Sequence, residues 1–227
     1  MKNNSITETK EIIVAFRYDD FSSNSPDVVD NALIHAFAQQ GVSCTFGVVP
    51  FVTAGDYRDS NPCEEIALTE TKVQILKKAM ANIDILIIND GETREFAKEP
   101  NIVRAAQKIL KYGPKMIIVK RGEYGAMMFS DNSVFATPAY PLHTINDPTG
   151  AGDTFAGGFM GYIASIDRFD EPAIRQGIIF GSVMASFAVE DFSLNRLMRL
   201  EKDEIRKRFK EFKKLSHFDD FHETFGI

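Results

Sequence analysis

Hydrophobic and polar positions in the first part of the chain alternate between strand-like and helix-like patterns. Apolar runs at 12–16 and 42–49 predict two strands, and helical spacing over 28–37 predicts a helix between them. Residues 50–65 are polar and turn-rich. A further helix is expected from about 68 to 80, so this part reads as strand, helix, strand and helix.

The remainder of the chain continues this alternation. Pro100 suits the first turn of a helix that runs to about Leu110 with apolar residues at a 3.6-residue period. Asp131 and Asn132 separate two short apolar runs and predict a hairpin. Strands are expected at 83–88, 116–119, 126–129 and 133–137, and helices up to 166, at 172–189 and at the charged end. The pattern predicts an α/β fold with a doubly wound, mostly parallel sheet and helices on both faces.

Composition narrows the classes of function. Hydrophobic residues make up 44% of the chain, charged residues 26%, and the net charge is −6, which is an ordinary globular mixture. The one dense basic stretch, 202–214, is interleaved with acidic residues and predicts a solvated helix, so no nucleic-acid partner is expected. No window offers the ~20 apolar residues of a membrane helix, so no membrane partner is expected either.

The chain has two cysteines, Cys44 and Cys63, without C-x-x-C spacing, and its N-terminus lacks a secretory pattern. Both features favour a cytoplasmic protein.

The strongest chemical signal is the glycine-rich stretch at 147–159. The small residues Gly150, Ala151 and Gly152 let backbone N–H groups approach a ligand closely, and the helix that begins there adds about half a positive charge. Such a turn can form an anion hole for a phosphoryl group. Asp153 follows directly and can take the proton from an attacking alcohol. The alternative interpretation is a tight turn before a closely packed helix.

This stretch resembles the second signature of the ribokinase-like, phosphofructokinase-B family of carbohydrate kinases. The resemblance implies a ribokinase-like fold and ATP-dependent transfer of the γ-phosphate to a hydroxyl of a sugar or nucleoside-like small molecule. It implies ATP and Mg²⁺ as cofactors, K⁺ in many members, and a homodimer in many members. By resemblance Gly150, Ala151 and Gly152 form the anion hole, Asp153 is the catalytic base, and Asp147 and Thr149 belong to a monovalent-cation site.

Two further motifs follow predicted strands. Asn89 and Glu92 are similar to the family's N-x-x-E motif, in which Glu92 would hold magnesium through water, although Asn-Asp-Gly alone is more often a turn. Their place after a strand is where α/β sheets bind ligands.

Lys120, Gly122 and Gly125 look like the family's K-x-G-x-x-G turn along the nucleotide phosphates. A hairpin turn with a surface lysine is the alternative. Ser182 aligns loosely with the helix that flanks the adenine and is a candidate nucleotide contact.

The kinase resemblance runs from about Ile83 to Ile205, and the beginning of the chain differs. The family's first glycine-rich signature, its sugar-binding aspartate and its β lid are not visible before Asn82. Instead, 16–22 and 41–50 resemble the opening of a polysaccharide deacetylase, in which Asp19 and Asp20 would supply a general base and a metal ligand. The histidine pair that should complete that metal site is missing. His35 falls within a predicted helix and is expected to be an ordinary helix residue.

We therefore expect a deacetylase-like segment at 1–82 in place of the kinase's acceptor half, and a ribokinase-like nucleotide-binding and catalytic region at 83–227, or one continuous domain. A sugar-type kinase is the leading hypothesis. The alternatives are a nucleotide-binding remnant without an acceptor site and a metal-dependent carbohydrate deacetylase using Asp19 and Asp20. In a further alternative, one of these two residues stands in for the sugar-binding aspartate.

Overall fold

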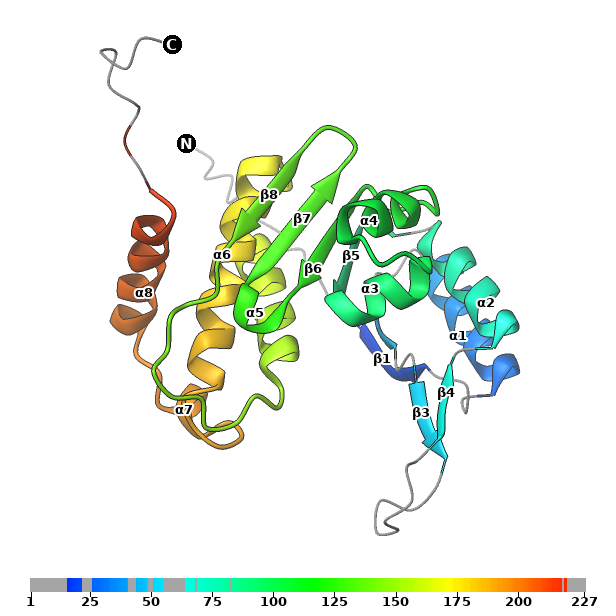
Figure 1. Ribbon diagram of the computed structural model, residues 1–227, viewed down its shortest axis with the longest axis horizontal. Coiled ribbons are helices and arrows are strands. Elements are labelled where there is room, and N and C mark those ends of the chain that lie inside the picture. Colours follow the sequence, from blue (N-terminus) through cyan, green and yellow to red (C-terminus); the bar gives the residue numbers. More distant parts are fainter. Residues whose placement is uncertain are drawn as a thin grey trace, which may run out of the picture. The chain divides into compact units, whose positions relative to one another are not determined.

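The computed structural model of the protein describes residues 16–21, 26–40, 44–48, 51–54, 64–67, 69–81, 83–217 and 219. The chain divides into two compact units, Met1–Ile83 and Asp84–Ile227. Figure 1 labels most of the helices and strands of both units.

In the first unit, β1 (Phe16–Phe21) and β2 (Cys44–Val48) are parallel neighbours, with α1 (Asp27–Gln40) between them in the chain. This is the predicted strand, helix and strand, although 12–15 of the first predicted strand lie outside the described residues. β3 (Phe51–Ala54) and β4 (Glu64–Ala67) form an antiparallel pair where only turns were expected. The strands are very short, and their partners are separated in the chain, so a local pattern gives little sign of them.

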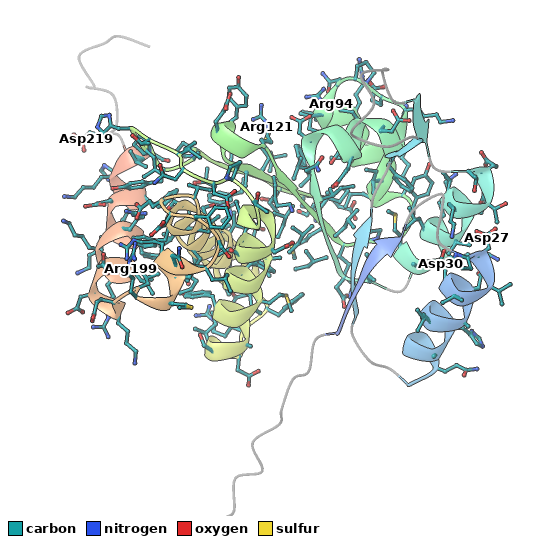
Figure 2. All side chains as sticks on the ribbon, turned by 90° about the horizontal axis from the view of Figure 1, so that it is seen from below. Asp27, Asp30, Arg94, Arg121, Arg199 and Asp219 are labelled. Atoms are coloured by element: carbon teal, nitrogen blue, oxygen red, sulfur yellow. The ribbon has the colours of Figure 1, made fainter. Side chains whose placement is uncertain are left out.

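The helix α2 (Glu70–Met80) is fixed against α1 by buried charges. Lys72 is 1% exposed, and its ammonium group contacts the carboxylates of Asp30 and, at 3.1 Å, Asp27. Figure 2 labels both aspartates on α1. An unpaired buried charge is costly, so the buried Lys72 and Asp30 depend on each other for their positions. The same helix buries an apolar face formed by Ile75, Leu76, Ala79 and Met80.

The second unit is built on a four-stranded sheet in the order β5-β6-β7-β8, with β5 Ile85–Asn89, β6 Met116–Lys120, β7 Ala126–Ser130 and β8 Val134–Thr137. β5 and β6 are parallel, whereas β6 and β7, and β7 and β8, are antiparallel. The α/β class is confirmed, and the sheet is mixed rather than mostly parallel. Short links join β6 to β7 and β7 to β8, and such links return the chain in the opposite direction.

The connection from β5 to β6 is longer and contains α3 (Asp90–Ala97) and α4 (Ile102–Leu110). α4 matches the predicted helix, although Pro100 lies one residue before the cap. Asn101 is the cap, and its Oδ1 accepts from the N–H groups of Val103 and Arg104, both at 3.1 Å. α3 was not predicted, because Asn-Asp-Gly after a strand reads as a turn.

Helices cover both faces of this sheet, as the pattern predicted (Figure 1). On one face, strand residues such as Ile118 and Met128 pack against Phe155 and Phe159 of α5 (Ala151–Ile166) and against α6 (Glu171–Ala188). On the other face α4 packs against β6 and β7. Alternate residues of a strand point to opposite faces, so both sets of side chains are buried.

The chain continues through a short helix, α7 (Asn195–Met198), to α8 (Lys202–Leu215), the predicted charged helix. Phe212 of α8 is buried with Val183 and Phe187 of α6 in a second, smaller core. Across the described ranges, no helix combines the length and the apolar character that crossing a membrane requires.

Candidate functional site

The glycine-rich stretch forms the N-terminus of α5. Gly150 caps the helix with φ +76°, a conformation that favours glycine. The N–H and Oγ1 of Thr154 donate to the Gly150 carbonyl at 2.8 and 2.9 Å. Asp153 lies in the first turn of α5 and is exposed. The Ala151 N–H donates to the Pro148 carbonyl at 3.2 Å. Because the first N–H groups of a helix have no acceptor within the helix itself, such an end can receive an anion.

Lys120, at the end of β6, reaches this loop from the sheet. A Cβ atom built on Gly152 would lie 2.8 Å from the Lys120 Nζ. The ammonium group is therefore held against the backbone of the glycine-rich turn, at a place that a side chain at 152 would fill. Two motifs far apart in the sequence are thus brought together.

Asn89 lies at the same edge of the sheet. It is the register partner of Lys120 across the parallel pair β5 and β6. Asn89 Oδ1 accepts from the Glu92 N–H at 2.8 Å, and Glu92 Oε2 accepts from the Asn89 N–H at 2.9 Å. These two bonds form a capping box at the start of α3. Asn89 and Glu92 therefore have a structural role of their own.

Asp90, the first residue of α3, links the end of β5 to Arg121, the residue after β6. This role was not predicted from the sequence. Its carboxylate accepts from Arg94 Nη2 at 3.3 Å and from Arg121 Nε at 3.4 Å. Figure 2 labels both arginines. The hydrogen bond from Arg94, with a further one from Arg121, lowers the pKa of Asp90 below its ordinary value. Both Asp90 and Arg121 stand at variable positions of their motifs, so neither motif points to them.

Gly122 and Gly125 shape the turn after Lys120. Gly122 and Gly125 have φ +54° and +87°, and the Gly125 N–H donates to the Gly122 carbonyl at 3.1 Å. A Cβ on Gly125 would lie 2.0 Å from the Thr137 carbonyl oxygen, whereas one on Gly122 would meet nothing within 4 Å. Glycine is therefore required at 125 for two reasons: the positive φ, and the lack of space for a side chain beside Thr137.

Asp147 and Thr149 lie just before the glycine-rich turn. Asp147 Oδ1 accepts from the Thr149 N–H at 2.9 Å, and its Oδ2 accepts from the Ser193 N–H at 3.3 Å. Hydrogen bonds from Thr149, and a weaker effect of Ser193, lower the pKa of Asp147. Ser193 was not singled out from the sequence, because its contact spans more than forty positions.

Ser182 lies in the middle of α6, and its hydroxyl donates to the Ile178 carbonyl at 2.9 Å. This bond within the helix accounts for the hydroxyl locally. A role of Ser182 as a nucleotide contact stays a prediction.

These motifs agree with a comparison against known families. The model of the pfkB family of carbohydrate kinases matches residues 6–199, well over half of the chain. The chain belongs to the pfkB family.

Individual relatives of this pfkB family protein are kinases that act on small molecules. This chain is 34% identical over 107 residues to a cytidine kinase of Thermococcus kodakarensis, and the aligned region covers 46% of this chain and 37% of the relative. It is 31% identical over 117 residues to a nucleoside kinase of Methanothermobacter thermautotrophicus, covering 51% and 35%.

A solved structure of aminoimidazole riboside kinase from Salmonella enterica, complexed with aminoimidazole riboside and an ATP analogue, has a TM-score of 0.65 and 18% identity. The similarity covers 86% of this chain and 62% of that one, and it shows a shared ribokinase-like fold. The chain thus spans about a third of the curated relatives and less than two thirds of this structure.

The family match corrects our interpretation of the first segment, since it begins at residue 6 and includes the residues that resembled a deacetylase. The deacetylase resemblance is not borne out. Asp19 and Asp20 lie within β1 rather than after it, and their side chains lie outside the described residues. A strand, helix and strand near paired carboxylates is common to many α/β folds. Such a segment therefore identifies no family.

The surroundings of His35 fit this correction. His35 is exposed on α1, and its Nε2 lies 2.8 Å from Gln39 Nε2, as expected of an ordinary helix residue.

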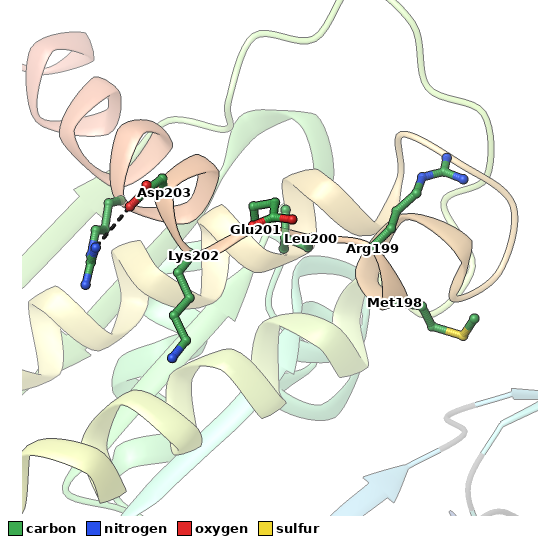
Figure 3. Close-up of a pocket in the computed structure, with 7 residues that line it drawn as sticks. Met198, Arg199, Leu200, Glu201, Lys202 and Asp203 are labelled. Carbon is green, nitrogen blue, oxygen red and sulfur yellow. Dashed lines mark hydrogen bonds and ion pairs between the residues drawn. The ribbon is translucent and has the colours of Figure 1, made fainter.

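A surface hollow of about 590 Å³ lies where α7 leads into α8 (Figure 3). None of its lining residues belongs to the motifs, so this hollow is separate from the candidate site of the pfkB family protein. The lining residues are Met198, Arg199, Leu200, Glu201, Lys202, Asp203 and Arg206.

Proposed function

We propose that this protein transfers the γ-phosphate of ATP to a hydroxyl of a sugar or nucleoside-like substrate. The observation that carries the proposal is the position of the Lys120 ammonium group against Gly152. A compact cation beside a helix N-terminus and its backbone N–H groups suits a phosphoryl group in transfer. The family match supports the same reaction class.

Each motif residue has a part in this proposal. The backbone N–H groups of Gly150, Ala151 and Gly152 stabilise the negative charge that develops on the transferred group. Asp153 accepts the proton of the acceptor hydroxyl as its oxygen attacks the γ-phosphorus, while the bond from that phosphorus to the ADP oxygen breaks. Lys120 neutralises phosphate charge. Gly122, Gly125 and Ser182 are proposed to line the nucleotide.

The residues present fit a hydrated magnesium ion. Glu92 uses Oε2 in the capping box, and a carboxylate offers about four lone-pair sites, so it can also hold a metal-bound water. Magnesium keeps several waters and binds through few protein ligands, so it does not require a cluster of acidic side chains. When bound, the ion would neutralise phosphate charge. Asn89 and Glu92, at the end of β5, would orient its waters.

Asp147 and Thr149 are proposed to hold a monovalent cation such as potassium. The lowered pKa of Asp147 keeps its carboxylate ionised, and anionic oxygen is a suitable ligand for such a cation. The hydrogen bonds from Thr149 and Ser193 fix the carboxylate beside the glycine-rich turn. A cytoplasmic location and self-association as a dimer stay predictions.

The test combines binding and transfer. Mg-ATP at 100 times its Kd should stabilise the protein by about 2.7 kcal/mol, measured as a rise of the thermal midpoint. Transfer is then assayed with labelled ATP against nucleosides, cytidine first, and against sugars. No thermal shift at millimolar Mg-ATP would overturn the nucleotide site. A shift without transfer to any acceptor would instead support a nucleotide-binding protein that lacks an acceptor site.

A further inference from the structure

We infer that Glu190, held between Arg196 and Arg208, positions the turn that carries Asp147 and so aligns the glycine-rich loop. Glu190 follows the end of α6, Arg196 lies in α7 and Arg208 in α8. The inference rests on the proposed function, because the loop matters only if it receives a phosphoryl group.

The three charged side chains are shielded from solvent. The exposed fractions are 22% for Glu190, 15% for Arg196 and 13% for Arg208. Glu190 Oε2 accepts from Arg196 Nε at 2.8 Å, and its Oε1 lies 2.6 Å from Arg208 Nη2. Both oxygens of one carboxylate are thus bound from two different helices. Such a charge-assisted pair of bonds fixes direction as well as distance.

Arg208 is itself fixed on several sides. Its guanidinium carbon lies 3.5 Å from the ring centroid of Phe187 and 4.4 Å from that of Tyr140. Its Nη1 donates to Ser186 Oγ at 3.1 Å. Because a planar guanidinium between two rings has little freedom, Arg208 can place Glu190 accurately.

The main chain at Glu190 holds the residues before the glycine-rich turn. The Glu190 carbonyl accepts from Asn146 Nδ2 at 2.6 Å, and the Val189 carbonyl accepts from the Asn146 N–H at 2.9 Å. Three residues further on, the Ser193 N–H donates to Asp147 Oδ2. A continuous series of ion pairs and hydrogen bonds therefore runs from α8 through Glu190 to Asp147, three residues before the helix cap at Gly150.

A shielded ionic network gains little net stability over apolar packing of the same volume, because its charges lose their water. What it provides is a fixed geometry. A phosphoryl-transfer loop needs this, since a misplacement of about 1 Å can cost on the order of 10²-fold in rate. Glu190, Arg196 and Arg208 are therefore positioning residues, and none of them has to touch the substrate.

The test uses Glu190→Gln in the full chain. The matched control is Asp191→Asn, which also removes one negative charge from the same loop but whose partner, Arg199, is 64% exposed. Hydrogen exchange by mass spectrometry or NMR follows the backbone N–H groups of Asn146, Thr149 and Ser193. In Glu190→Gln we expect these groups to exchange on the order of tenfold faster and kcat to fall by about tenfold or more, with KM for ATP changed less than about twofold. The control should leave all of these values near those of the parent.

A second variant, Arg208→Lys, keeps the charge and removes the planar fork. It should change the same amide groups and kcat in the same direction, to a smaller extent, in a protein that retains its near-ultraviolet circular dichroism. If exchange in either folded variant rises only within α8, and the amide groups at 146–149 and kcat match the parent, the inference is wrong and the network merely anchors α8. If the parent itself transfers no phosphate, the proposed function fails, and the exchange data still decide whether Glu190 positions the turn.

Discussion

The ammonium group of Lys120 occupies the space into which a side chain at Gly152 would extend. Gly152 lies within α5, and the atoms nearest to a Cβ built on it are Nζ and Cε of Lys120. The backbone there does not need glycine for its conformation. The glycine is instead needed to leave room for a cation beside the helix N-terminus.

Gly152→Ala should therefore weaken ATP binding while leaving the fold intact. The new methyl group displaces the flexible end of Lys120, and loss of a charge-assisted contact corresponds to about a ten- to hundredfold rise in the Kd for Mg-ATP. Thermal unfolding and isothermal titration measure the two effects. Gly157→Ala, in the same helix with nothing within 4 Å of its Cβ, is the control. It should gain about 0.5–1 kcal/mol of helix stability and bind ATP like the parent.

A second pair of glycines separates backbone strain from steric overlap. Gly122→Ala puts a side chain at φ +54° in open space and should cost about 1–2 kcal/mol. Gly125→Ala combines φ +87° with a clash against the Thr137 carbonyl, so it should cost about 3 kcal/mol or more. Urea denaturation of both variants gives the free energies of unfolding. Equal losses in the two variants would contradict the close approach of Gly125 to β8.

The elements that could be predicted from the sequence are those whose signals are local. The hairpin of β7 and β8 follows from Asp131 and Asn132 between two apolar runs. The period of apolar residues gives α4. The charged composition gives α8. The meeting of Lys120 with the glycine-rich turn followed from a resemblance to a family, and the structure places the Lys120 ammonium group beside Gly152.

The structural features that were not predicted from the sequence depend mostly on contacts between residues far apart in the chain. The start of α3 read as a turn, because the capping box of Asn89 and Glu92 uses the same residue types as a turn. The pairing of β3 with β4 and the contacts of Glu190 with two arginines have no local period or motif. The first segment was assigned to the wrong family for a related reason. A carboxylate pair near a strand end is informative only when its metal-ligand partners are also identified.

The ion pairs of Asp90 predict a dependence of stability on pH. Arg94 and Arg121 lower the pKa of Asp90 in the folded protein, so the unfolded state binds more protons in that range and stability rises with pH. The contribution is complete above the ordinary pKa of an aspartate, about 3.9, and is lost as the pH falls through the lower folded value. Asp90→Asn should therefore be less stable than the parent at pH 6, and the difference should shrink below about pH 4.

Urea denaturation between pH 6 and pH 3 measures this convergence. Asp131→Asn, in the exposed turn between β7 and β8, controls for the removal of one negative charge. A difference between Asp90→Asn and the parent that stays constant with pH would show that the ion pairs do not carry the effect.

The last prediction separates the chemistry of the site from its binding. Asp153→Asn keeps the size of the side chain in the first turn of α5 and removes the proposed base. Phosphoryl transfer should fall by about 10² to 10⁴, the usual contribution of a positioned general base. The affinity for Mg-ATP should stay the same or rise slightly, because one negative charge is removed near the phosphates while Lys120 and the backbone of 150–152 remain.

Asp167→Asn is the control. It removes the same charge at the opposite end of α5, where φ is +47° and asparagine is well tolerated. Transfer rates under saturating ATP and titration of Mg-ATP distinguish the two effects. A variant that loses transfer and ATP binding together would assign Asp153 to the nucleotide site rather than to the acceptor hydroxyl.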